Sequence, residues 1–339
     1  SVAEALAPTR RLRRPAVDPP DMSLVSAFTS AILPIVSVMG LGYLLASALD
    51  VEVEPLNTVA LYLFLPALIF HSIVTTTLSG ATVARIFAGV GLFVVATMGV
   101  TELVDRLLGV PEPYRSADVL AGSLPNAGFY GIPLAEFAFG AVGRTTAVIY
   151  ITAQAFLMYT LGVYVASRGG GEAGIGAVEE IFRLPLVYAI AAAGVVRALG
   201  VAPPADGTFM TTTSLVGDAS IPLMLVIVGI QLSGLEYGSV GRVLRPSLVK
   251  LVFAPAVGLG VALALGAFGD PAVARVFVLL CATPVALIPL ALTLSYSDVE
   301  ERDGLSASEY LTVTIFVTTV ASVPVLTVLI TLLRGGAVF

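Results

Sequence analysis

The sequence has no tryptophan, one cysteine and one histidine, and only 12% of its 339 residues are charged. A soluble domain usually carries about 25% charged residues. The single Cys281 excludes a disulfide framework within one chain, and His71 alone cannot build a zinc site. No basic patch with interleaved aromatic residues occurs, so nucleic acid is not an expected partner. These absences exclude disulfide-rich, zinc-dependent and nucleic-acid-binding classes.

Apolar residues are abundant instead, at 57% of the chain with a mean hydropathy of +0.99. Apolar runs of about 20 residues recur along nearly its whole length, and such runs are typical of membrane-spanning helices. We therefore predict an all-α polytopic membrane protein with ten transmembrane helices. The expected spans are 24–48, 55–79, 82–108, 116–140, 144–167, 184–200, 208–233, 242–267, 272–296 and 308–333.

The chain divides into a tail and two halves. Residues 1–21 are rich in arginine and proline and lack an apolar run, which predicts a disordered or non-native N-terminal tail. Residues 22–167 and 184–339 each hold five expected helices, joined by a short central loop at 168–183. Five is odd, so the second half must insert upside down relative to the first, as in inverted-repeat transporters.

Prolines fall at similar places in the two halves, although chance spacing of 21 prolines is the alternative explanation. The fourth span carries Pro125 and Pro133, and the ninth carries Pro284 and Pro289. A proline inside a helix removes a donor and clashes with the preceding turn. Backbone groups freed in this way must be satisfied by protein or by a wet cavity. We therefore predict two broken helices, although simple kinks that shape packing would explain the same prolines.

Two broken helices in matching places are a sequence indication of a transport site. The N-termini of half-helices carry partial positive charge and unpaired N–H groups, which suit a carboxylate. Asn126 adds an amide that both donates and accepts hydrogen bonds. The expected ligand is a small organic anion.

A few polar residues lie within the expected spans, where they are costly. Asp218 either binds a coupling cation or proton, or pairs with an arginine at the interface. His71 either exchanges protons or packs as a hydrogen-bonded histidine near the membrane surface. Gln154 either faces the cavity or packs. Asp105 closes the third span beside an arginine and is expected to be a solvated helix end.

Several segments resemble the auxin efflux carrier family, which includes the plant PIN exporters. The most specific is Leu124-Pro-Asn-Ala-Gly-Phe-Tyr-Gly-Ile-Pro-Leu134, which resembles the family's first crossover helix. Four further segments agree in order along the chain, so that the resemblance covers about residues 24–333. They are Leu65-Pro66 through His71, Gln154 through Leu161, Ser214 through Ala219, and Ile288-Pro289 through Tyr296.

The resemblance implies two inverted five-helix repeats that form two units. Helices one, two, six and seven would form a scaffold that often makes a homodimer. Helices three to five and eight to ten would form a transport domain that moves by an elevator-type mechanism. The substrate would bind where spans four and nine cross, and Asp218 or His71 remains a possible proton-coupling residue. The expected substrate-binding residues are Pro125, Asn126, Gly128, Gln154, Thr283, Pro284 and Pro289.

The chain departs from the plant exporters in two places. Its central loop, 168–183, is short like that of prokaryotic members, some of which carry dicarboxylates. Ala127 stands where the plant exporters usually have threonine, so aromatic auxin is not the only expected carboxylate.

The sequence thus predicts a secondary transporter that exports an organic anion, auxin-like or another carboxylate, without a cofactor. The alternative is a sodium- or proton-coupled symporter of the related bile-acid-carrier type. An intramembrane enzyme is a remote alternative, because the chain has no HExxH or GxSxG motif. Basic residues in the loops, with Lys250 counted among them, predict a cell (plasma) membrane protein with both termini outside.

Overall fold

The computed structural model describes residues 23–49, 51–168, 182, 184–234, 240–296, 306–336 and 338–339, and every regular element in these ranges is a helix. The predicted tail, most of the central loop and the acidic 297–305 segment lie outside the described residues. In chain order the helices are α1 (Leu24–Ala27), η1 (Phe28–Ile32), α2 (Leu33–Ala48), α3 (Val53–Val59), η2 (Ala60–Phe64), α4 (Leu65–Thr75), α5 (Gly80–Leu107), α6 (Tyr114–Ser123), η3 (Ala127–Gly131), α7 (Ile132–Leu157), η4 (Met158–Gly162), α8 (Val163–Ser167), α10 (Pro185–Leu199), α11 (Thr208–Ser233), η5 (Val240–Val243), α12 (Leu244–Leu248), η6 (Val249–Phe253), α13 (Ala254–Ala264), η7 (Gly266–Gly269), α14 (Pro271–Cys281), α15 (Ile288–Tyr296) and α16 (Ala307–Arg334).

Seven helical stretches within the described ranges are long and apolar enough to cross a membrane. Two further apolar helices, Pro185–Leu199 and Pro271–Cys281, are shorter. The expected fourth and fifth spans follow one another without a loop, as two helices that meet at a kink within the stretch Ala127–Ser167. This stretch bends at Gly140, whose φ of 63° and ψ of −144° are outside the helical region. Such a backbone conformation strongly favours glycine.

Four of the prolines in the described helices follow a π-turn and do not break the helix. Helical π-segments end two residues before Pro34, Pro66, Pro133 and Pro255. Proline lacks an N–H and clashes with the carbonyl four residues earlier, and a π-turn relieves that clash by widening the helix. Pro222 lies inside the continuous α11. Two of the expected spans contain a non-helical segment, which comprises residues 124–126 after α6 and residues 282–287 after α14.

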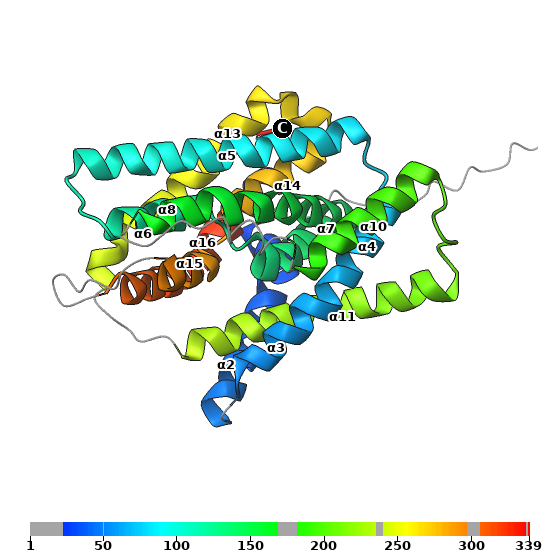
Figure 1. The fold of residues 1–339 in the computed structure, drawn as a ribbon, viewed down its shortest axis with the longest axis horizontal. Helices are drawn as coiled ribbons and strands as arrows, with labels where there is room; N and C mark the ends of the chain where they lie inside the picture. Colours follow the sequence, from blue (N-terminus) through cyan, green and yellow to red (C-terminus); the bar gives the residue numbers. More distant parts are fainter. Residues whose placement is uncertain are drawn as a thin grey trace, which may run out of the picture.

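The helices form two groups, which occupy different parts of Figure 1. In the lower part, α2 and α4 pack on α11, and α4 also packs on α10. In the upper part, α5 packs on α6, α7 and α13, while α14 packs on α7. The main hydrophobic core runs through both groups.

Glycines allow the helices of the first group to approach closely. A Cβ at Gly229 of α11 would overlap the carbonyl of Met39 on α2, and a Cβ at Gly42 would overlap the carbonyl of Val226. Small residues at such crossings let helix backbones touch, which favours association in a membrane. The α2–α11 pair is therefore a tightly locked unit.

Candidate substrate site

The two interrupted helices cross at Pro125 and Val285, which form an isolated antiparallel bridge. The backbone N–H of Asn126 donates to the carbonyl of Pro284 at 2.8 Å, and that of Ala286 donates to the carbonyl of Leu124 at 3.3 Å. Each break therefore satisfies backbone groups that the other break frees. This arrangement confirms that the prolines mark breaks at these two positions.

Asn126 stands at the start of the half-helix that continues as η3 and α7. Its φ of −75° and ψ of 59° are not helical, and its side chain does not cap the helix. The side-chain amide of Asn126 forms no hydrogen bond with any described residue, and the residue is half-buried. The first N–H groups of a helix have no partner within the helix. The amide and this helix end together present donors that suit a carboxylate.

Gly128 leaves open space at the same helix end, because a Cβ placed there would meet no atom within 4 Å. Gly131, one turn later, is packed tightly, with a Cβ position only 2.9 Å from Leu280 Cδ2. The space at Gly128 is therefore local to the start of the half-helix.

Gln154 of α7 reaches the crossing from the side. Its Nε2 donates to the carbonyl of Pro125 at 3.0 Å, and its buried Oε1 has no partner among the described residues. Of the predicted site residues, Gln154 is thus the side chain that holds the first break in place.

The second break is held mainly by its own backbone and by α16. The Thr283 hydroxyl donates to the carbonyl of Leu280 at 2.8 Å, and Thr318 Oγ1 accepts from the N–H of Val285 at 3.2 Å. Pro284 and Pro289 are buried. Thr283 therefore supports the turn after α14 and is fully buried, whereas Thr318 was not predicted.

Asp218 lies apart from the crossing, in an ion pair with Arg144. Arg144 also binds Glu136, so one guanidinium links two carboxylates from α7 and α11. The Asp218 side chain is 49% exposed. Of the two alternatives for Asp218, pairing with an arginine is the one the structure shows. His71 is half-buried, and no hydrogen bond of its ring occurs within the described residues.

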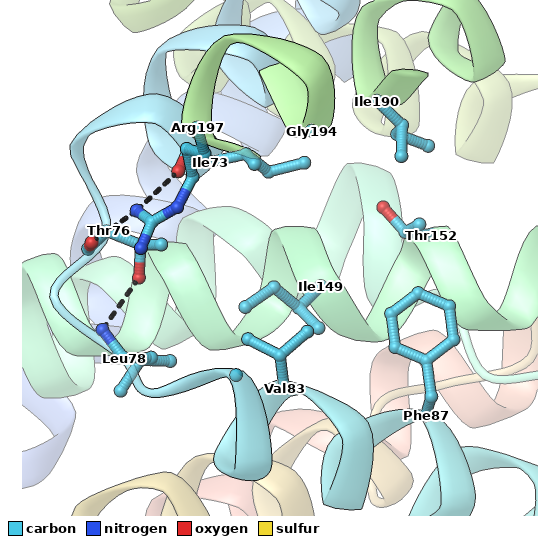
Figure 2. A pocket seen from close by; sticks show the side chains of 11 residues that line it. Ile73, Thr76, Leu78, Val83, Phe87, Ile149, Thr152, Ile190, Gly194 and Arg197 are labelled. Atoms are coloured by element: carbon cyan, nitrogen blue, oxygen red, sulfur yellow. Dashed lines mark hydrogen bonds between the residues drawn. The ribbon is translucent and has the colours of Figure 1, made fainter. Parts of the chain in front are cut away.

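Cavities run along the boundary between the two helix groups. One, of about 320 Å³, lies between α4 and α10 on one side and α5 and α7 on the other (Figure 2). Arg197 borders it and donates to the carbonyls of Ile73 and Thr76 at 3.0 and 2.6 Å. Another, of about 440 Å³, reaches Leu287 in the second break. The first cavity is bordered by the part of α7 that follows Gly140, and the second by the second break.

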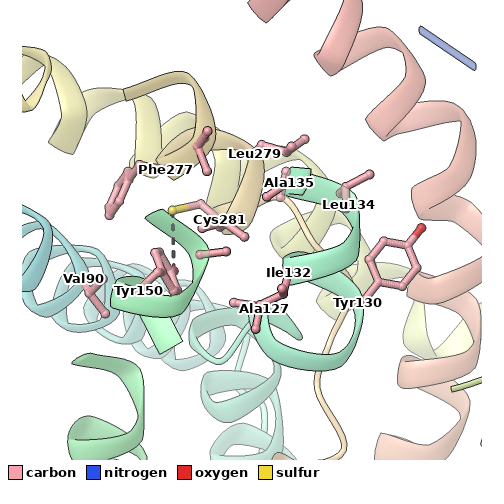
Figure 3. Packing of buried hydrophobic residues seen from close by; sticks show 14 of the residues in the cluster. Val90, Ala127, Tyr130, Ile132, Leu134, Ala135, Tyr150, Phe277, Leu279 and Cys281 are labelled. Carbon is pink, nitrogen blue, oxygen red and sulfur yellow. Dashed lines mark hydrogen bonds between the residues drawn. The ribbon is translucent and has the colours of Figure 1, made fainter. Parts of the chain in front are cut away.

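Lys250 was placed with the loops in the sequence analysis, and this is wrong because its side chain is fully buried. Its Nζ donates to the carbonyl of Cys281 at 3.3 Å and lies 5.9 Å from the centre of the Phe93 ring. Cys281 ends α14 and contacts Tyr150, as Figure 3 shows. Among the described residues no carboxylate pairs with this ammonium. A lone lysine within an apolar run was the signal that could have found it.

A second polar cluster, formed by Asp105, Asp118, Arg245 and Tyr310, was not predicted from the sequence. Asp105, expected to be a solvated helix end, is 1% exposed, as is Asp118 of α6. Both carboxylates contact Arg245 of α12, with 3.1 Å from Arg245 Nε to Asp105 Oδ1. The Tyr310 hydroxyl of α16 donates to Asp118 Oδ1 at 2.8 Å. Four helices bury these groups together, and no spacing in the sequence indicated the pairing.

Seven described helices long and apolar enough to cross a membrane, together with two interrupted helices that cross each other, are typical of a multi-pass membrane transport protein. The comparison with family models gives the same class, because the family described as "Membrane transport protein" matches residues 27–175 and 172–330. The chain belongs to this family. The resemblance to auxin efflux carriers is thereby confirmed at the level of the family.

Two relatives are similar over much of their length. A Rhizobium meliloti protein named "Putative malonate transporter" is 25% identical over 334 residues, covering 92% of this chain and 98% of the relative. A Methanothermobacter thermautotrophicus protein named "Uncharacterized transporter" is 24% identical over 239 residues, covering 69% of this chain and 78% of the relative. Both relatives are named as transporters.

Proposed function

We propose that the protein carries a small organic anion, with a dicarboxylate such as malonate as the first candidate, and that the anion binds at the crossing of the interrupted helices. The observation that carries this proposal is the half-helix starting at Asn126, with its unbonded amide and the open space at Gly128. The printed name of the Rhizobium meliloti relative supports a dicarboxylate.

The fold suits alternating access by an elevator movement. The group around α2, α4, α10 and α11 is locked by close glycine contacts and would be the scaffold, with a homodimer formed through it. The group around α5, α7, α13 and α14 holds the crossing and would be the transport domain. The boundary cavities offer room for one group to slide past the other. Ten spans in two inverted repeats are part of this proposal, and so is export across the cell membrane.

Uptake into proteoliposomes tests the proposal directly. Purified protein is first screened for thermal stabilisation by malonate, other mono- and dicarboxylates and auxin, and the best stabiliser is then used for transport. Asn126→Ala should reduce its transport strongly while the protein stays folded. Gly128→Leu should block transport by filling the space that a ligand would occupy.

Thr213→Ala is the matched control, because the Thr213 hydroxyl donates to the carbonyl of Phe209 within its own helix, α11. It should transport like the wild type. Unchanged transport in both Asn126→Ala and Gly128→Leu would contradict a site at the crossing. Replacement of sodium by potassium in the assay tests the sodium-coupled alternative. Transport should fall if the protein is a sodium-coupled symporter and should stay unchanged if it is not.

A further inference from the structure

The Asp105–Asp118 cluster carries more negative than positive charge in a buried place. Two carboxylates, each 1% exposed, face one guanidinium, that of Arg245. Asp105 Oδ2 has no hydrogen-bond partner in the described part of the chain. A buried charge without a partner is strongly unfavourable, and two carboxylates that share a site relieve it when one takes up a proton.

Several other charged groups lie near the cluster, and they have interactions of their own. On α5, Glu102 pairs with Arg106 at 2.7 Å and with Arg168. Beyond α5, Glu112 binds Arg115 at 2.9 Å. The remaining nearby groups are Arg242, which is exposed, Glu309, which caps α16, and Tyr114, whose ring packs on Tyr310.

Glu112 is unsuited to hold the proton. Burial would raise the pKa of its carboxyl, but hydrogen bonds from Ser116 and the Arg115 guanidinium outweigh burial and hold that pKa below its ordinary value. It therefore stays ionised at neutral pH, and the buried aspartates are the remaining pair.

Water can reach the cluster from one side. Arg245 and Tyr310 line a cavity of about 580 Å³ that also includes Tyr114 and Arg242. A proton leaving the aspartate pair would pass to water in this cavity. The cavity thus provides both the source and the acceptor of the proton.

The cluster is tied mechanically to both interrupted helices. Asp118 lies six residues before Leu124 on the first, which is about 9 Å along the helix axis. Tyr310 shares α16 with Thr318, which binds the N–H of Val285 in the second. The bond from Tyr310 to Asp118 closes a ring of contacts through the crossing. The Tyr310–Asp118 bond thus joins the cluster to both breaks through a continuous chain of contacts.

We propose that Asp105 and Asp118 share one proton, and that its release to the adjoining cavity and its return are coupled to anion transport. This rests on the proposed function. The site lies in the proposed transport domain and is separate from Asp218 and His71, so the coupling proton would travel with the moving group.

Infrared spectroscopy tests proton binding without any transport. Purified wild-type protein should show the carbonyl stretch of a protonated carboxylic acid at neutral pH, which disappears on alkalinisation. The Asp105→Asn/Asp118→Asn double variant should lack that band. A band that persists in a folded double variant overturns the site, and so does its absence from the wild type.

Transport then tests coupling. One proton per transition changes a population by about tenfold for each pH unit, so wild-type transport should vary with pH accordingly. Asp118→Asn, and Tyr310→Phe as a milder variant that keeps the packing, should flatten or displace the pH profile. Glu54→Gln is the control, because Glu54 is an exposed carboxylate on α3 outside the cluster, and it should keep the wild-type profile.

The outcomes separate the two proposals. If no anion is transported but the infrared band behaves as expected, the proposed function fails and the proton site stands. If the anion is transported with a pH profile that Asp118→Asn and Tyr310→Phe leave unchanged, the coupling is refuted. If sodium stabilises the wild type but not Asp118→Asn, and no carboxylic acid band is found, the site binds a cation and the proton proposal is overturned.

Discussion

The side-chain amide of Gln154 donates a 3.0 Å hydrogen bond to the carbonyl of Pro125, the residue at which the first interrupted helix crosses the second. Replacement of Gln154 by Leu would leave that carbonyl without its donor in a buried place. An unsatisfied buried group costs about 1–3 kcal/mol. We expect Gln154→Leu to lower the thermal stability in detergent and to impair transport. Thr152→Val, on the same helix, should affect transport less, because Thr152 bonds to its own helix.

The crossing was predictable from the sequence, whereas the groups that surround it were not. Pro125 and Pro284 mark helix breaks by local chemistry, since proline lacks a backbone donor. However, Pro34 and Pro66 have the same chemistry and only follow π-turns within continuous helical stretches. The two true breaks persist because each supplies the other's hydrogen bonds.

Tertiary contacts account for the residues that were missed. Asp105 lies near a helix end, and the sequence there is the same whether its carboxylate is hydrated by water or pairs with Arg245. Asp118 pairs with residues 127 and 192 positions later in the chain. Such pairings depend on how the helices pack against one another, so they cannot be predicted from the residue pattern within one helix.

Lys250 offers a test of buried charge. Its ammonium is fully buried, and within the described residues it makes one hydrogen bond, of 3.3 Å, to the carbonyl of Cys281. That bond contributes about 1 kcal/mol, whereas desolvation of an ion costs several. Lys250→Met keeps the length of the side chain and should leave the thermal unfolding temperature unchanged or higher. A clear fall would show that the ammonium has further partners. Lys250→Ala should be destabilised, because it leaves a cavity.

Asp218 and Arg144 form an ion pair in which the carboxylate is half exposed. Exposed ion pairs contribute about 0–1 kcal/mol. Asp218→Asn should therefore unfold within a few degrees of the wild type, and its transport should keep the wild-type dependence on pH. Loss of that dependence would assign the coupling proton to Asp218.

The contact of Gly229 with Met39 should tolerate no side chain. A Cβ there would overlap backbone, which cannot move as a flexible side chain does. Gly229→Val should lower the thermal stability strongly, by several kcal/mol, or prevent assembly of α2 with α11. Gly40→Ala is the control, because a Cβ at Gly40 meets nothing within 4 Å. Thermal unfolding in detergent measures both.

The orientation can be read by thiol labelling, because the one native cysteine, Cys281, is fully buried. Phe339→Cys should react with a membrane-impermeant reagent in intact cells if the C-terminus faces outward, as the loop charges predict. Leu108→Cys, in the exposed turn after α5, should react only after permeabilisation. The reverse pattern would refute the predicted orientation.

The bend at Gly140 has a consequence for how the site moves. The helical stretch Ala127–Ser167 has 41 residues, which would span about 60 Å if straight, twice the thickness of a bilayer core. A single residue folds this rod back on itself with no intervening loop. The half-helix that begins beside Asn126 and the helix that carries Gln154 are thus two arms of one stiff hairpin. The angle at Gly140 therefore determines how Gln154 on one arm meets Pro125 at the start of the other, and a changed backbone at Gly140 would alter the proposed anion site directly.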